Sequence, residues 1–222
     1  MDHTVQNLIN IKNDIDLNLV NLKINKSPNI IAVSKTFGLE KIMPLIEYGH
    51  TDFGENKVQE AYEKWSGVKE KFSDLKLHMI GKLQTNKVKL AVKIFDYIHS
   101  VDNAKLAKKI SEEQSKQKRK LKIFLQVNIG DELQKSGVNK DELLDLFTFC
   151  KSIDLDIIGL MCIPPINQDT TNYFSEMKNL NKSLNLYELS MGMSSDYVDA
   201  IKFGATYVRI GSKIFGSRIN KF

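Results

Sequence analysis

Lys35 follows a run of apolar residues, and its position is the first sign of chemistry in this chain. The segment 30–34 reads Ile-Ile-Ala-Val-Ser, which is typical of a buried strand, so Lys35 stands where a strand finishes and a ligand site begins. Burial disfavours the charged form of lysine and lowers its pKa, which provides the neutral amine that condenses with an aldehyde. The alternative is a lysine whose ammonium group extends from a strand end into water. The residues at the other strand ends must distinguish these two interpretations.

Two segments near the C-terminus have the composition of phosphate-binding loops. The segment 190–196 reads Ser-Met-Gly-Met-Ser-Ser-Asp, and the segment 209–216 reads Arg-Ile-Gly-Ser-Lys-Ile-Phe-Gly. Each combines glycine and hydroxyl residues before an expected helix, so backbone N–H and side-chain O–H groups can both bind an anion. The alternatives are helix capping by Ser195 or Asp196 and an ordinary Gly-Ser turn. Neither segment matches the Walker pattern.

Three further residues at expected strand ends have chemistry of their own. Arg209 lies two residues before Gly211 and keeps its charge, so it must either pair with an acidic neighbour or face a ligand. Next to a pyridine nitrogen, it would disfavour protonation and weaken the ring as an electron sink. Asn56 could contact a ring or cap the following helix. His78 could be an acid–base group, but a hydrogen-bonded core histidine is the favoured interpretation.

Metal and nucleic-acid chemistry find little support in the sequence. The four histidines are scattered and the two cysteines lack a paired ligand spacing; they are His3, His50, His78, His99, Cys150 and Cys162. The net charge is +5, but the densest basic run, 116–122, ends a polar helical pattern and is typical of a solvated helix end. No aromatic residues alternate with these charges. We therefore expect no metal and no nucleic-acid partner.

Short apolar runs alternate with helical patterns along the chain, and this alternation predicts the fold. The strand-like runs are 30–35, 51–55, 77–81, 97–102, 121–128, 156–161, 186–191 and 206–210. The helical patterns between and after them are 39–48, 57–72, 84–95, 103–118, 139–152, 170–184 and 195–203, with Gly49 and Gly204 at helix ends. Several runs are continuously apolar, as in a parallel sheet covered on both faces. The pattern favours an α/β fold, a single (β/α)8 TIM-type barrel, over a doubly wound open sheet.

Length and composition set the remaining expectations. A helix over 2–24 precedes the barrel, and Pro44 predicts that the first helix of the alternation starts late or kinks. The 222 residues contain no linker or repeat, so we expect one domain over 1–222. No apolar stretch approaches 18 residues and no segment resembles an export signal, which predicts a cytoplasmic protein. The charged helices show no obvious large apolar patch, so we expect a monomer.

The chemical motifs, taken in order, resemble those of the pyridoxal phosphate homeostasis protein family. They are the segments 33–36, 53–56, 78–87, 190–196 and 209–216. The resemblance spans nearly the full length, and its motifs fall on five expected strand ends. It implies a barrel like the N-terminal domain of alanine racemase, a fold type III arrangement that holds pyridoxal 5′-phosphate as an internal aldimine. Lys35 corresponds to the aldimine lysine, Arg209 to the arginine facing the pyridine nitrogen, Asn56 to a residue lining the ring, and Ser194, Gly211 and Ser212 to phosphate-binding positions.

The resemblance also implies a cofactor carrier or regulator without a reaction of its own, with enzymes that lack their cofactor as possible recipients. Racemases of this kind use a second base from an additional domain, whereas this sequence is expected to stop after the last barrel helix, at Phe222. We therefore assign no catalytic residue. The alternatives are a monomeric amino-acid racemase that depends on pyridoxal phosphate, with His78 as its only candidate second base, a barrel for another phosphorylated metabolite, and a basic RNA-binding accessory protein.

Overall fold

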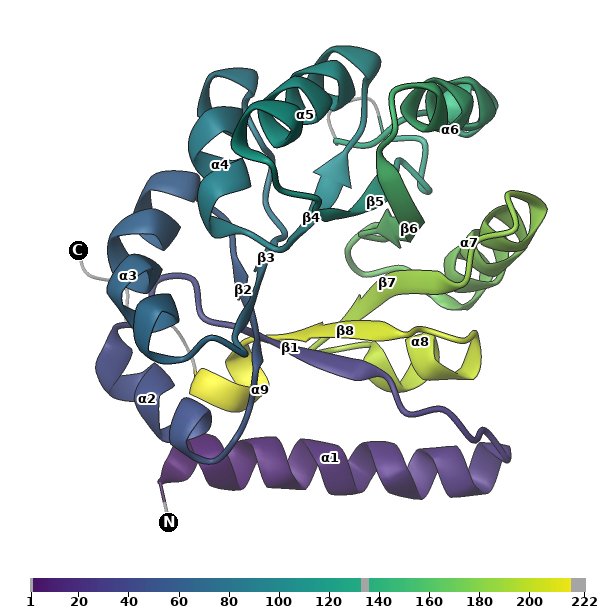
Figure 1. The fold of residues 1–222 in the computed structure, drawn as a ribbon. Helices are drawn as coiled ribbons and strands as arrows, with labels where there is room; N and C mark the ends of the chain where they lie inside the picture. Colours follow the sequence, from purple (N-terminus) through teal and green to yellow (C-terminus); the bar gives the residue numbers. More distant parts are fainter. Residues whose placement is uncertain (1, 133–135, 217–222) are drawn as a thin grey trace.

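Eight parallel strands form a closed barrel in the computed structural model, which describes residues 2–132 and 136–216 (Figure 1). Each strand pairs with its neighbours in sequence, and β1 closes the barrel against β8. The strands are β1 (Asn29–Val33), β2 (Asp52–Glu55), β3 (Lys76–Met79), β4 (Tyr97–Val101), β5 (Lys122–Val127), β6 (Asp156–Cys162), β7 (Glu188–Met193) and β8 (Tyr207–Ile210). The predicted (β/α)8 architecture is confirmed, and the open sheet is excluded.

Helices surround this ring of strands, because parallel neighbours require a crossover on the outside of the barrel (Figure 1). The α-helices are α2 (Leu39–Glu47), α3 (Val58–Lys71), α4 (Val88–Ile94), α5 (Ala104–Gln117), α6 (Leu143–Ser152), α7 (Thr171–Ser183), α8 (Tyr197–Lys202) and α9 (Ser212–Phe215). Two short 3-10 helices, η1 (Thr85–Lys87) and η2 (Lys140–Glu142), precede α4 and α6. The predicted leading helix is α1 (His3–Leu22), which contacts α2, α8 and α9.

The buried side chains fall into a large outer core and a small inner cluster. Val208 and Ile210 of β8 belong to the large core between strands and helices. Tyr207 belongs to the separate inner cluster with Ile31, Phe124 and Met161. Because successive strand residues point to opposite faces, Tyr207 and Arg209 both face the barrel interior. The interior of this barrel is therefore partly apolar and partly polar.

The observed boundaries of the strands and most helices lie within two residues of those predicted; α4 and α6 begin four residues later, because a 3-10 helix occupies the first turn of each predicted helix. Gly49 and Gly204 follow α2 and α8 with φ of +94° and +90°, a conformation that glycine adopts without a Cβ clash. Of the two predicted effects of Pro44, the late start is wrong, because α2 begins at Leu39 and contains the proline; a kink stays a prediction. Proline has no N–H, so α2 lacks the one hydrogen bond that residue 44 would donate to the Glu40 carbonyl. The expectation that the sequence stops at Phe222, directly after the last barrel helix, concerns a residue outside those that the structure describes.

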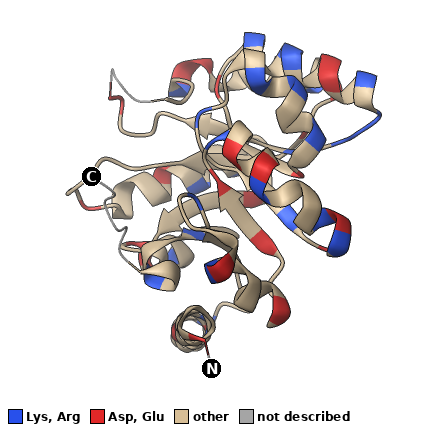
Figure 2. Ribbon diagram, turned by 90° about the vertical axis from the view of Figure 1, so that its left-hand side faces the viewer, with Lys and Arg blue, Asp and Glu red and all other residues tan. Residues whose placement is uncertain are grey.

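Lys and Arg residues are interspersed with Asp and Glu residues along the helices (Figure 2). Four members of the basic run have acidic partners: Lys116 pairs with Glu113 at 3.6 Å, Arg119 with Asp96 at 3.0 Å, Lys120 with Asp154 at 3.3 Å and Lys122 with Asp156 at 2.7 Å. These surface pairs agree with the interpretation of the run as a solvated helix end. Within 2–132 and 136–216, no helix has the length and apolar character needed to span a membrane.

Candidate functional site

Lys35 lies in a tight turn directly after β1, at the carboxyl end of the barrel. The Ser34 N–H continues the ladder by donating to the Gly54 carbonyl at 3.0 Å, and the Phe37 N–H then donates back to the Ser34 carbonyl at 3.1 Å. Thr36 has a φ of +70°, which is uncommon for a residue with a Cβ and marks a locally constrained turn. The Lys35 side chain is half-buried. The turn therefore places Lys35 at the rim of the barrel.

A buried carboxylate supports the turn that carries Lys35. Glu55, the last residue of β2, is fully buried, and its Oε1 accepts hydrogen bonds from Ser34 Oγ at 2.8 Å and Trp65 Nε1 at 3.0 Å. The ammonium of Lys64 lies 2.8 Å from the same oxygen. Lys64 also donates to the Ser34 and Phe37 carbonyls, each at 3.0 Å. Lys64 of α3 thus holds both ends of the Lys35 turn by hydrogen bonds, while its charge is paired with Glu55.

Asn56 follows Glu55 and brings a polar atom without a protein partner to the same rim. Its Oδ1 is buried and accepts no hydrogen bond from the described residues. The alternative role, capping of the next helix, is not observed: α3 has Lys57 at its cap position and no side-chain cap bond. A buried amide oxygen without a partner is costly, and a bound ligand can supply the missing donor.

The two predicted phosphate-binding segments meet at the ends of β7 and β8. The Gly211 N–H donates to Ser194 Oγ at 3.3 Å, so the two loops are in direct contact. Ser212 follows at the first position of α9 and is exposed. Asp196 does not cap α8 with its side chain; its Oδ1 instead accepts from the Met193 N–H at 2.6 Å. This bond fixes the loop in which Ser194 lies.

The predicted phosphate-binding segments lie next to β1, the strand that precedes Lys35. In the β1–β8 pairing Ala32 is opposite Ile210, which sets Val33 beside Gly211. A Cβ added to Gly211 would lie 3.4 Å from the Val33 side chain, so the backbone at Gly211 lies close to the end of β1. The residues predicted from separate motifs are therefore brought to one sector of the barrel rim.

Arg209 is buried in the barrel interior without a carboxylate partner among the described residues. Its Nη1 donates to Ser190 Oγ and its Nη2 to the Cys162 carbonyl, both at 2.8 Å. The alternative of a salt bridge to an acidic neighbour is therefore not observed in the described part of the chain. Burial lowers the pKa of Arg209, yet guanidinium remains charged at neutral pH. A guanidinium group has five N–H donors, so N–H groups beyond those that bind Ser190 and Cys162 can bind a ligand.

His78 is a core histidine, as the favoured interpretation predicted. Both ring nitrogens have partners: Nδ1 lies 3.0 Å from His99 Nε2, and Nε2 lies 3.1 Å from Asp52 Oδ1. The ring is fully buried and stacks on Tyr97 with centroids 4.2 Å apart. Burial lowers its pKa, a shift that the Asp52 hydrogen bond partly offsets. These contacts give no support to His78 as a second base.

Sequence reasoning missed Ser190 and His99 as polar residues of the barrel interior, and it missed the supporting role of Glu55 and Lys64. Ser190 Oγ lies 2.9 Å from His99 Nδ1 and also accepts the Arg209 bond. The signal available was that His78 and His99 occupy the third position of consecutive strands, β3 and β4. Residues in equivalent positions of neighbouring strands lie close together in a barrel.

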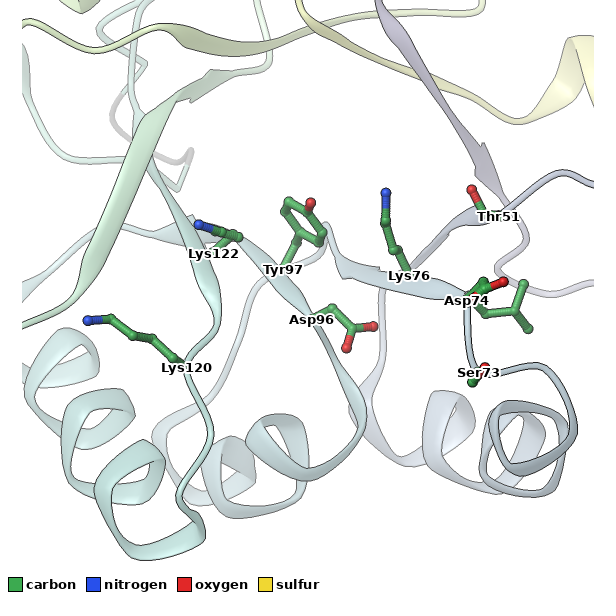
Figure 3. A pocket seen from close by; sticks show the side chains of 9 residues that line it. Thr51, Ser73, Asp74, Lys76, Asp96, Tyr97, Lys120 and Lys122 are labelled. Carbon is green, nitrogen blue, oxygen red and sulfur yellow. The ribbon is translucent and has the colours of Figure 1, made fainter.

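A large pocket lies elsewhere, at the amino end of the barrel (Figure 3). Its volume is about 590 Å³, and Thr51, Lys76, Tyr97 and Lys122, which stand before or at the start of their strands, line it. Figure 3 shows these side chains with Lys120, Asp74, Asp96 and Ser73 at the strand beginnings. None of the predicted site residues lines this pocket. Its size therefore does not identify the site that the strand-end chemistry defines.

The strand-end residues suit a phosphorylated carbonyl compound. A half-buried amine can condense with a carbonyl carbon, the hydroxyl and amide groups of the β7 and β8 loops can bind a phosphate, and Arg209 can face an electron-rich ring nitrogen. Within the described residues no group of three or more potential metal ligands is present. Fold and site together define the class of (β/α)8 barrels with a lysine at the end of the first strand and, after the last two strands, loops of glycine and serine that suit an anion.

Comparison with known proteins agrees with this class. Residues 12–219 match the family model described as "Alanine racemase, N-terminal domain". The pyridoxal phosphate homeostasis protein of Pasteurella multocida is 37% identical over 225 residues, covering 96% of this chain and 97% of that protein.

Solved structures give the same result. PipY of Synechococcus elongatus, in a structure described as having PLP bound, has a TM-score of 0.80 and 35% identity over 91% of this chain and 100% of that chain. An alanine racemase of Clostridium difficile shares the fold, with a TM-score of 0.69 at 15% identity over 94% of this chain and 58% of that chain. The chain belongs to the pyridoxal phosphate homeostasis protein family.

Proposed function

We propose that this protein holds pyridoxal 5′-phosphate through a covalent bond to Nζ of Lys35 and acts as a carrier in cofactor homeostasis. The observation that carries the proposal is the convergence of the β1, β7 and β8 ends, where the turn with Lys35 adjoins the contact of Gly211 with Ser194. The name of the P. multocida relative and the PLP reported bound to PipY support the same function.

The residues present fit this cofactor in three respects. Ser194, Gly211 and Ser212 supply hydroxyl and amide groups for a phosphate. Among the described residues the buried Oδ1 of Asn56 has no donor, and a bound ring system can provide one. Arg209 keeps its charge in the interior without a carboxylate partner among the described residues. The last two features are costly by themselves, and an anionic, aromatic ligand offsets that cost.

The proposed function needs no reaction of the protein's own. When bound, the cofactor supplies an aldehyde that condenses reversibly with a primary amine. Lys35 would hold that carbon, and Arg209 would disfavour a proton on the ring nitrogen, which weakens the ring as an electron sink. Both nitrogens of His78 already have partners, so His78 does not provide a second base. This arrangement favours storage and exchange over racemisation.

Several finer features belong to the same proposal. We propose that residues 1–222 form one domain, that the protein is a cytoplasmic monomer, and that enzymes lacking their cofactor are its recipients. Exchange of the amine bonded to the cofactor provides a route for delivery, because a lysine of a recipient can replace Lys35 without any oxidant or reductant.

The absorbance of the lysine-bound cofactor tests the proposal. Wild-type protein incubated with pyridoxal phosphate is expected to show the visible band of the bound form, and Lys35→Ala and Lys35→Arg are expected to lose it. Lys35→Arg keeps the cation but cannot form the bond. Lys151→Ala, which removes an exposed lysine of α6, is the matched control and should retain the band. An unchanged band in both Lys35 variants would refute the assignment.

A further inference from the structure

A continuous line of hydrogen bonds crosses the barrel interior from Arg209 to Asp52. Arg209 of β8 contacts Ser190 of β7 at 2.8 Å, and Ser190 contacts His99 of β4 at 2.9 Å. His99 contacts His78 of β3 at 3.0 Å, and His78 contacts Asp52 at the start of β2 at 3.1 Å. The four inner members, Arg209, Ser190, His99 and His78, are at most 4% exposed. We call these five residues the interior chain.

The Asp52 end of the interior chain sets the direction of donation, and the Arg209 end is compatible with it. Arg209 is a donor only, so Ser190 Oγ accepts from it and keeps its own proton available for Nδ1 of His99. A neutral His99 that accepts at Nδ1 carries its proton on Nε2 and donates to His78.

The Asp52 end fixes this direction. Burial favours a raised pKa for Asp52, but the His78 hydrogen bond and nearby charges outweigh burial and lower it, so the carboxylate is an acceptor. His78 therefore donates from Nε2 and, as a neutral ring, accepts at Nδ1 from Nε2 of His99, which leaves Nδ1 of His99 to accept from Ser190. Both rings are neutral in this arrangement, in agreement with the lowered pKa of each, which burial causes.

Ring packing leaves the interior chain little freedom to rearrange. His78 stacks on Tyr97 and His99 stacks on Phe124, each with ring centroids 4.2 Å apart. Every dipole along the line directs its negative end toward Arg209, and the line ends on the charge of Asp52. Ser190 therefore presents a lone pair to the guanidinium, which offsets part of the cost of a buried cation without a direct carboxylate partner.

We propose that Ser190, His99, His78 and Asp52 are positioning residues that fix the guanidinium of Arg209 toward the ring nitrogen of the bound cofactor. This inference rests on the proposed function, because it assigns the four residues to the same site. None of the four needs to touch the cofactor. Asp52 lies at the opposite end of the barrel, with a side chain that is 13% exposed, so the interior chain would let a residue at the amino end influence the cofactor ring.

The first part of the test examines the protein without cofactor. Side-chain ¹⁵N shifts of uniformly labelled protein report the tautomer of each histidine. At neutral pH we expect His78 and His99 to be neutral with the proton on Nε2. Asp52→Ala should change the His78 pattern, because Nε2 then loses its acceptor, whereas Asp52→Asn retains an acceptor oxygen and should preserve it. A charged His78 or His99, or a proton on Nδ1 of either ring, would overturn the proposal.

The second part measures cofactor affinity together with the ¹⁵N shift of pyridoxal phosphate labelled at the ring nitrogen. We expect Ser190→Ala, His99→Phe and Asp52→Ala each to weaken binding by roughly threefold to tenfold, as loss of one ordered hydrogen bond implies, and to shift the ring-nitrogen resonance. Asp52→Asn should restore both values. Tyr207→Phe is the matched control, because its ring contacts His78 and His99 but its hydroxyl lies outside the interior chain.

The outcomes separate this inference from the proposed function. If the affinity and ring-nitrogen resonance of Asp52→Ala and Ser190→Ala equal those of Tyr207→Phe, the positioning role is refuted. If His99→Phe does not fold, the two other variants still decide. If wild-type protein forms no bond at Lys35, the proposed function fails, and the histidine tautomers in the cofactor-free protein show whether the interior chain exists.

Discussion

The two ends of the barrel contain similar residue types but use them differently. At the amino end, Lys122 pairs with Asp156 and Lys69 pairs with Asp96 around an open pocket of about 590 Å³. At the carboxyl end and among the described residues, Asn56 has a buried oxygen without a hydrogen-bond partner, and Arg209 is buried without a carboxylate partner. Charges that satisfy one another stabilise a fold, whereas a buried oxygen without a donor and a buried cation without a carboxylate favour a ligand. The size of the amino-end pocket is therefore no guide to the proposed site, because none of the proposed site residues lines it.

The largest expected effect concerns the buried carboxylate that supports the Lys35 turn. Glu55→Ala removes the acceptor for Ser34 and Trp65 and leaves Lys64 without its buried partner. Breaking such a pair is expected to lower the free energy of unfolding by about 3–5 kcal/mol. Urea denaturation of the wild type and the variant measures this change in the free energy of unfolding. Glu60→Ala, which breaks the exposed pair with Lys57, should change stability by less than about 1 kcal/mol. Equal effects of the two variants would contradict the supporting role of Glu55.

The next effect is a pH dependence at the amino end. Burial lowers the pKa of His50 from 6.5 to about 4, although the charge of Asp52 opposes this shift. The unfolded chain therefore binds the proton more tightly, so stability is retained above about pH 6.5 and is lost as the pH falls toward 4. Between about pH 6.5 and about pH 4, the free energy of unfolding falls by about 3 kcal/mol through this group.

His50→Gln isolates this contribution from those of the other histidines. Glutamine keeps a donor for the Asp52 carbonyl, which accepts from His50 Nε2 at 2.9 Å, but has no proton to gain. Between about pH 7 and about pH 4, the variant should lose about 2–3 kcal/mol less stability than the wild type. Parallel stability profiles of the two proteins would show that His50 is not buried in its neutral form.

The smallest effect compares the two ends directly through cofactor affinity. Ser194→Ala removes a hydroxyl from the proposed phosphate-binding loops and should weaken pyridoxal phosphate binding by about tenfold, as expected for a hydrogen bond to a charged group. Lys76→Met removes a charge from the amino-end pocket and should leave the affinity unchanged. Titration of the visible absorbance measures both. A larger loss for Lys76→Met than for Ser194→Ala would reverse the assignment of the two ends.

The sequence was informative where a property is local. Short, largely apolar runs that alternate with helical patterns predicted every strand of the barrel, because strands covered on both faces bury most of their side chains. The ends of those runs predicted the position of Lys35, Ser194 and Gly211, because the carboxyl ends of parallel strands share one rim.

The sequence was uninformative where partners come from distant strands or helices. Ser190 and His99 are 91 residues apart and meet only after the barrel closes in one register. Glu55 and Lys64 pair because α3 packs back on the strand before it, which periodicity alone does not specify. The roles of Asn56 and Arg209 stayed open for the same reason: whether a polar group is paired depends on which neighbours the closed barrel provides.

Reduction of the loaded protein with borohydride, followed by peptide mass spectrometry, tests the covalent assignment most directly, because reduction makes the bond between the cofactor and its lysine permanent. We predict that the peptide containing Lys35 carries the added mass of reduced pyridoxal phosphate and that Lys35→Arg abolishes this modification. Modification of a different lysine, with the Lys35 peptide unchanged, would contradict the account.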